Sequence, residues 1–128
     1  MEKLEYIPGD LVKFATNTYT IVNFEENFLH NKICYALIST NSTKTAFVAD
    51  RDILPIPLTP EILEKNGWAK DKEGYINDSY HLHLCEKNNR YSVYKVVNDN
   101  IVWLTDVKNV SDLQHIFFGL NINYEMEV

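Results

Sequence analysis

Two histidines and a cysteine at alternating positions, His81, His83 and Cys85, are the residues of this sequence best suited to chemistry. If the segment from Ser79 to Cys85 forms a strand, all three side chains share one face, with successive Cβ atoms roughly 6.5–7 Å apart. Imidazole and thiolate groups bind Zn²⁺ or Cu, but a closed zinc site needs a fourth ligand. No Cys-x-x-Cys or second histidine cluster supplies one. We interpret the trio as a solvent-facing strand surface, keep it only as a weak metal candidate, and predict no cofactor.

Known catalytic patterns are missing from the sequence. The four glycines never cluster into a phosphate-binding loop, and neither His-Glu-x-x-His nor Gly-x-Ser-x-Gly occurs. A cysteine nucleophile requires a neighbouring base or cation. Cys34 lies in an apolar segment and Cys85 precedes Glu86, so neither has suitable surroundings. The sequence therefore predicts a protein that is not an enzyme.

Basic and aromatic residues interleave at Arg90, Tyr91, Tyr94 and Lys95, a pattern typical of sheet surfaces on which nucleic-acid bases stack. The charge balance points the other way: 12 basic and 18 acidic residues give a net charge of −6, and both halves of the chain are acidic. Nucleic-acid binders normally present a cationic surface to phosphates. A nucleic-acid-associated module, using these residues or the β-rich first half, is therefore the alternative to a protein-binding one.

Large aromatic side chains supply much of the binding energy of protein interfaces when they are exposed. Trp68, Trp103 and Phe118 are the candidates in this sequence. Phe118 lies off the apolar stripe of its predicted helix, whereas packing in the core is the competing interpretation for both tryptophans. Those of the three that are exposed in the fold are predicted to be interface anchors for another protein.

The elements that position these residues begin with short, β-branched and aromatic strands in residues 1–57. They are expected at Leu11–Phe14, Tyr19–Phe24, Ile33–Ile38 and Thr45–Val48. A 3₁₀ turn at Ala49–Asp52 is expected before a last strand at Ile53–Leu54. This arrangement predicts a small antiparallel barrel or rolled sheet as the first module, and an SH3-like barrel is the specific expectation.

The second module, residues 58–128, follows an extended connector that runs from Leu54 to Pro60 and contains three prolines. Thr59 is a good N-cap and Pro60 suits the first helical position, which predicts a helix over about Pro60–Asn66 that ends at Gly67. An antiparallel meander is then expected, with strands at Tyr75–Ile76, Ser79–Cys85, Arg90–Val97 and Ile101–Val107.

A second helix is expected to begin at a capping box formed by Ser111 and Gln114. Its apolar stripe consists of Leu113, Ile116, Phe117 and Leu120. The alternating end, Tyr124–Val128, predicts a final short strand. The predicted fold class is α+β: an SH3-like barrel followed by an antiparallel meander packed with two short helices.

The compartment is predicted from what the chain lacks. It contains no apolar run of the ~18 residues that span a membrane, and its first residues lack the basic and apolar regions of a signal peptide. Without export, Cys34 and Cys85 are expected to remain free thiols. We therefore expect a cytoplasmic protein with no membrane contact.

The sequence resembles a family of small uncharacterised proteins. The resemblance lies in two stretches, Asp52–Trp68 and Asp112–Leu120, and in the acidic end Glu125–Val128. Members of this family are frequent in Bacteroides-type gut bacteria, their prophages and related phages. The resemblance implies no activity and contributes no catalytic residues. It implies a phage or mobile-element setting, either in the bacterial host cell or with the phage. The resulting expectation is a non-enzymatic accessory protein that binds another protein, of host or phage.

Overall fold

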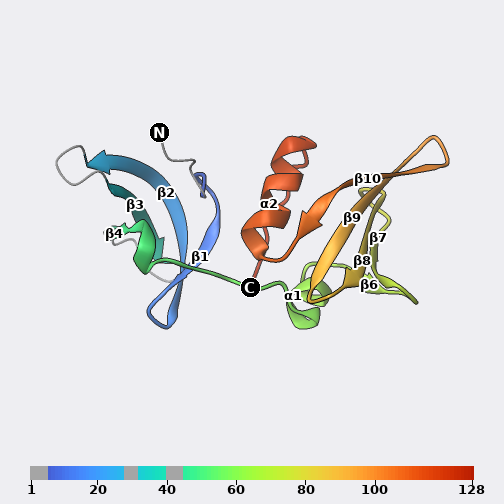
Figure 1. Ribbon diagram of the computed structural model, residues 1–128, viewed down its shortest axis with the longest axis horizontal. Helices are drawn as coiled ribbons and strands as arrows, with labels where there is room; N and C mark the ends of the chain where they lie inside the picture. Colours follow the sequence, from blue (N-terminus) through green and yellow to red (C-terminus); the bar gives the residue numbers. More distant parts are fainter. Residues whose placement is uncertain (1–5, 28–31, 40–44) are drawn as a thin grey trace. The chain divides into compact units, whose positions relative to one another are not determined.

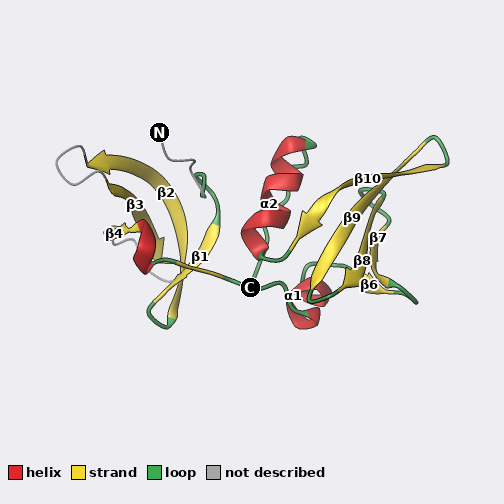
Figure 2. Cartoon of the chain, viewed as in Figure 1, coloured by secondary structure: helices red, strands yellow, loops and turns green. Residues whose placement is uncertain are grey.

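The computed structural model describes residues 6–27, 32–39 and 45–128. The chain divides into two compact units, Met1–Ile56 and Pro57–Val128. Strands predominate in both units, and the two α-helices belong to the second (Figure 2). Both sheets are antiparallel throughout, so the α+β class is confirmed. Among the described residues, no helix is long and apolar enough to cross a membrane.

The first unit is a five-stranded sheet in the order β4-β3-β2-β1-β5 (Figure 1). Its strands are β1 (Leu11–Phe14), β2 (Asn17–Asn27), β3 (Lys32–Ser39), β4 (Thr45–Ala49) and β5 (Leu54–Pro55). A 3₁₀ helix, η1 (Asp50–Asp52), connects β4 to β5 where the sequence predicts one. The sheet is open, with β4 and β5 at its edges among the described strands, so the predicted closed barrel is wrong.

The core of the first unit consists of one face of this sheet and the segment before it. Tyr6 packs edge-to-face on Tyr35, with ring centroids 5.7 Å apart. The other members are Val12, Ile21, Leu37, Val48 and Ile53. Gly9, at a φ of 97°, forms the turn into β1, and the buried Asp10 carboxylate accepts a hydrogen bond from the Ile7 amide. This hydrogen bond satisfies the Ile7 amide, which lies in the turn beside the core.

The second unit is a five-stranded sheet in the order β10-β9-β8-β7-β6, with two helices. Its strands are β6 (Ala69–Lys70), β7 (Gly74–Asn77), β8 (Leu82–Lys87), β9 (Arg90–Val97) and β10 (Asn100–Val107). The helices are α1 (Pro60–Lys65) and α2 (Val110–Gly119). Figure 1 shows both helices on the same side of this sheet. The three hairpins β7–β8–β9–β10 form the predicted meander.

One face of the second sheet is covered. Its buried side chains alternate along the strands: Tyr75, Leu82, Leu84, Tyr91, Val93 and Val107. The register places Tyr75 opposite Leu84 and Leu84 opposite Val93, so they share that face. The helices contribute the buried Leu63, Leu113 and Phe117. The core of this unit therefore lies between the helices and one face of the sheet.

The helix starts show one correct prediction and one error. Thr59 Oγ1 accepts a hydrogen bond from the Ile62 amide at 3.3 Å, as its N-cap role predicts. Helix α2 begins two residues earlier than expected, because Asn109 is its N-cap and the Asp112 carboxylate accepts from the Asn109 amide at 3.0 Å. The predicted capping box at Ser111 is therefore wrong. Asn and Asp are as suitable for these positions as Ser and Gln.

The C-terminal segment Tyr124–Val128 is not a strand, contrary to the prediction. The buried side chain of Asn66 binds it instead. Asn66 Oδ1 accepts from the Glu127 amide at 2.8 Å, and Asn66 Nδ2 donates to the Glu127 carbonyl at 2.7 Å. The Tyr124 hydroxyl also donates to Asn66 Oδ1, at 3.2 Å. A side-chain amide has the donor and acceptor of a backbone peptide, so one residue takes the place of a neighbouring strand.

Candidate interaction surface on the second sheet

The face of the second sheet opposite the core carries a row of large side chains. Ile76 pairs with His83, His83 with Tyr94, and Tyr94 with Trp103. Residues opposite each other in antiparallel strands point to the same face. Among the described elements, no helix lies on this outer face, because the buried helix residues pack with the other one. The row therefore forms a mixed aromatic and aliphatic surface that ends at β10.

Strand β10 is the edge at which this surface ends. It pairs only with β9 among the described strands. Ile101 is 67% exposed, Trp103 is 56% exposed, and Val102 is also exposed. The run from Asn100 to Leu104 contains no charge. Natural edge strands are usually short or carry charges or proline, because an open edge can pair with another chain. A bulge between Trp103 and Thr105 interrupts β10, but the residues before it are unprotected.

Asp106 holds the Trp103 side chain in place. The Ser92 hydroxyl donates to Asp106 Oδ1 at 2.7 Å, and the Trp103 indole Nε1 donates to the same oxygen at 3.4 Å. Arg90 Nε lies 3.6 Å from the other carboxylate oxygen. The pKa of Asp106 is lowered, chiefly by the Ser92 hydrogen bond, with smaller contributions from Trp103 and Arg90. These contacts favour one orientation of the exposed indole before any ligand arrives.

Trp68, the other predicted tryptophan anchor, is buried. It is 3% exposed, and its amide donates to the Leu63 carbonyl at 3.0 Å just after α1. Its indole Nε1 has no hydrogen-bond acceptor among the described residues. Trp68 is therefore a core residue, as the competing interpretation predicts, and it is not accessible as an interface anchor.

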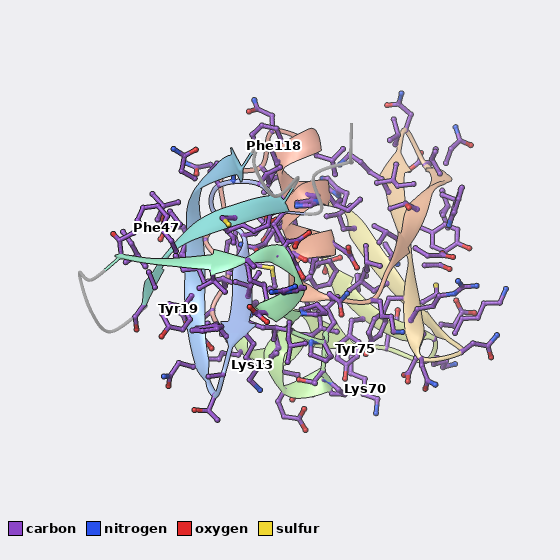
Figure 3. All side chains as sticks on the ribbon, turned by 60° about the vertical axis from the view of Figure 1, so that its left-hand side comes forward. Lys13, Tyr19, Phe47, Lys70, Tyr75 and Phe118 are labelled. Atoms are coloured by element: carbon purple, nitrogen blue, oxygen red, sulfur yellow. The ribbon has the colours of Figure 1, made fainter. Side chains whose placement is uncertain are left out.

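Phe118, the third predicted anchor, is exposed on the last turn of α2 (Figure 3). Its 77% exposure agrees with its place off the apolar stripe, whose members Leu113 and Phe117 are buried. No other large apolar side chain of α2 is strongly exposed. A single exposed aromatic residue is common on protein surfaces. Phe118 is thus available for contact, but α2 supplies it with no surrounding patch.

The four residues of the nucleic-acid hypothesis do not form one surface. Tyr91 is buried in the core, and Lys95 lies on the same face with its Nζ donating to the Tyr80 carbonyl at 3.0 Å. Arg90 and Tyr94 lie on the outer face. The predicted surface shared by Tyr91 and Tyr94 is therefore wrong, because residues three apart on a strand face opposite sides.

The predicted trio of histidines and cysteine is also divided. His81 lies in the turn before β8, with a φ of 55°, so strand alternation does not apply to it. His83 and Cys85 are half-buried on the outer face. The pKa of the Cys85 thiol is raised, chiefly by burial and then by Glu73, whose carboxylate lies 3.9 Å from Sγ. Among the described residues, no three potential ligands are placed to hold a metal ion.

Comparison of this chain with protein-family models, curated proteins and solved structures finds no match. The surface itself is therefore the basis on which a function is inferred. Its members Ile101 and Asp106 were not among the sequence-predicted residues. One signal was present in the sequence: the last strand of a meander has a single neighbour, and this one contains the uncharged run Ile-Val-Trp-Leu.

Proposed function

We propose that this chain is a non-enzymatic binding protein whose second unit captures a protein segment at β10. The observation that carries the proposal is an uncharged edge strand that exposes Ile101 and Trp103, with the Trp103 indole bound by Asp106. An extended segment that adds to such an edge gains main-chain hydrogen bonds. Its side chains would meet the outer-face row that ends in Tyr94 and Trp103.

The energetic centre of this site is Trp103. Buried tryptophans at interfaces are enriched among the residues whose truncation costs about 2 kcal/mol or more. Ordering a free side chain on binding costs about 0.5–1.5 kcal/mol. Because Asp106 already orients the indole, part of that cost is met before the partner binds. An exposed aromatic residue without such a contact, such as Phe118, lacks this advantage.

The wider setting is part of the same proposal. The sequence resemblance supports an accessory protein of a phage or mobile element, acting in the bacterial cytoplasm or with the phage. The strand order β4-β3-β2-β1-β5 and the 3₁₀ helix before β5 support an SH3-like first unit in open form. The net charge of −6 supports a protein partner over nucleic acid.

The proposal is tested by selecting a displayed library of random peptides against the purified full chain. We expect enriched peptides to be extended and to alternate aromatic or β-branched residues with polar ones, since such sequences fit a sheet edge. Replacing Trp103 with Ala should weaken their binding at least about tenfold, which corresponds to 1.4 kcal/mol. Phe47→Ala is the matched control, because Phe47 is an aromatic residue of the first unit that is 71% exposed, and it should leave binding unchanged.

Two results would count against this function. Peptides that bind Trp103→Ala as tightly as the wild type would place the site elsewhere. Binding of single-stranded oligonucleotides that falls with salt, in the absence of peptide binding, would favour the nucleic-acid alternative.

A further inference from the structure

We propose that a second copy of this chain occupies β10, so that two β10 strands pair antiparallel about a two-fold axis. The two five-stranded sheets would then form one continuous sheet across the dimer. This inference rests on the proposed function, because it names the partner of the same edge. It starts from three facts: β10 is an edge among the described strands, its first half is exposed, and that half is uncharged.

The symmetry of such a pair restricts its register. A two-fold axis between antiparallel edge strands runs perpendicular to the sheet, so it keeps each side chain on its own face. Because opposite residues of antiparallel strands share a face, one residue must then lie opposite its own copy, and every other contact occurs twice. The bulge after Trp103 ends the regular pairing, which leaves Asn100 to Trp103 as regular strand. If Val102 lies on the two-fold axis, Ile101 of each copy lies opposite Trp103 of the other, and both residues belong to this regular run.

With Val102 at the axis, the side chains of the two copies match. Ile101 lies opposite Trp103 of the second copy on the outer face, and the same contact occurs twice. A β-branched residue opposite an aromatic one is a favourable cross-strand pair. Val102 meets Val102 of the second copy on the inner face. Each pair removes from water an apolar side chain that is exposed in the single chain.

Overall charge opposes a second copy, but the local charge distribution along β10 permits one. Each chain has a net charge of −6, so two copies repel at long range. The paired run itself contains no charge, and the carboxylates at the ends of β10, Asp99 and Asp106, lie outside it. No carboxylate is therefore placed opposite another. Added salt should screen the long-range repulsion and strengthen the dimer, whereas it would weaken binding of a basic partner.

The short paired run predicts a reversible, concentration-dependent dimer. We would measure its dissociation constant by sedimentation equilibrium of the full chain at low and high salt. The decisive variants are Val102→Asp and Val102→Lys, which place two like charges face to face at the axis. Each variant alone should be monomeric. Their mixture should restore the dimer, because the opposite charges then meet.

Val102 is exposed, so both variants should fold, and circular dichroism checks this directly. Phe47→Ala is again the control and should dimerise as the wild type does. A wild type that stays monomeric at every concentration would overturn the inference, as would variants that dimerise separately. Variants that remain monomeric when mixed would overturn it as well. If the monomeric wild type still binds selected peptides through Trp103, only self-pairing fails; if it binds none, the proposed function fails too.

Discussion

The two tryptophans of the second unit have opposite environments. Trp68 is buried and its indole N–H has no acceptor among the described residues, whereas Trp103 is exposed and its indole N–H is bound by Asp106. Residue type alone makes both of them candidate anchors. Their positions in the fold separate them, because Trp68 follows α1 into the core and Trp103 lies on the outer face of an edge strand. Burial thus gives Trp68 a structural role and leaves Trp103 accessible for the proposed recognition.

The two edges of the same sheet differ in a similar way. Strand β6 has only two residues, the second of which, Lys70, begins the charged run Lys70–Glu73. Strand β10 has eight residues, and its first half carries no charge. Short length and charge are the usual protections of an edge. One edge of this sheet is therefore protected against pairing and the other is open to it.

The largest expected effect is the loss of stability in Trp68→Ala. Truncating a buried aromatic residue leaves a cavity and typically costs about 3–5 kcal/mol. Urea denaturation followed by circular dichroism measures the free energy of unfolding, with Trp103→Ala as the matched control. A loss below about 1 kcal/mol would mean that Trp68 does not pack as the structure shows.

The second largest effect is expected for Trp103→Ala, which should lose binding without a comparable loss of stability. Trp103→Ala should change the free energy of unfolding by less than about 1 kcal/mol, because the side chain is exposed. It should nevertheless remove both peptide binding and dimer formation. The same denaturation curves, with sedimentation of the same sample, test this. A large destabilisation combined with unchanged binding would reverse the roles of the two tryptophans.

The sequence predicted elements better than it predicted environments. Strand β9 has its predicted bounds and α1 begins at the predicted Pro60, because alternation, prolines and caps act locally. The burial of Trp68 depends on which segments pack around it, which its neighbours in sequence do not specify. His81 has the alternating spacing of a strand residue but adopts a turn with positive φ. Likewise, Asn66 and the C-terminal segment are about sixty residues apart, and their pairing has no local signal.

A smaller effect is the difference in quenching between the two indoles. Trp103→Phe leaves Trp68 as the single tryptophan, and Trp68→Phe leaves Trp103. Acrylamide should quench Trp103 strongly and Trp68 weakly, because the exposed fractions are 56% and 3%. Raising the protein concentration should protect Trp103 alone if β10 pairs with itself. Equal quenching of the two variants would contradict the burial of Trp68.

The smallest effect is the pH dependence of the contact that holds Trp103. The folded pKa of Asp106 lies below its ordinary value, so the contact stabilises the fold above the ordinary Asp pKa of about 3.9. That contribution disappears as the pH falls through the lowered folded pKa. Because the Ser92 hydroxyl is the main cause, Ser92→Ala should raise the Asp106 titration midpoint measured by NMR.

The same titration, followed by acrylamide quenching of Trp103 in Trp68→Phe, should show the indole becoming more accessible at low pH. Asp106→Asn is the control, because it keeps an acceptor for the indole N–H and removes the titrating proton. The increase in Trp103 quenching at low pH should therefore vanish in Asp106→Asn. If Ser92→Ala left the midpoint unchanged, the Asp106 carboxylate would not be held as described. Trp103 would then bind its partner without the advantage of a fixed orientation.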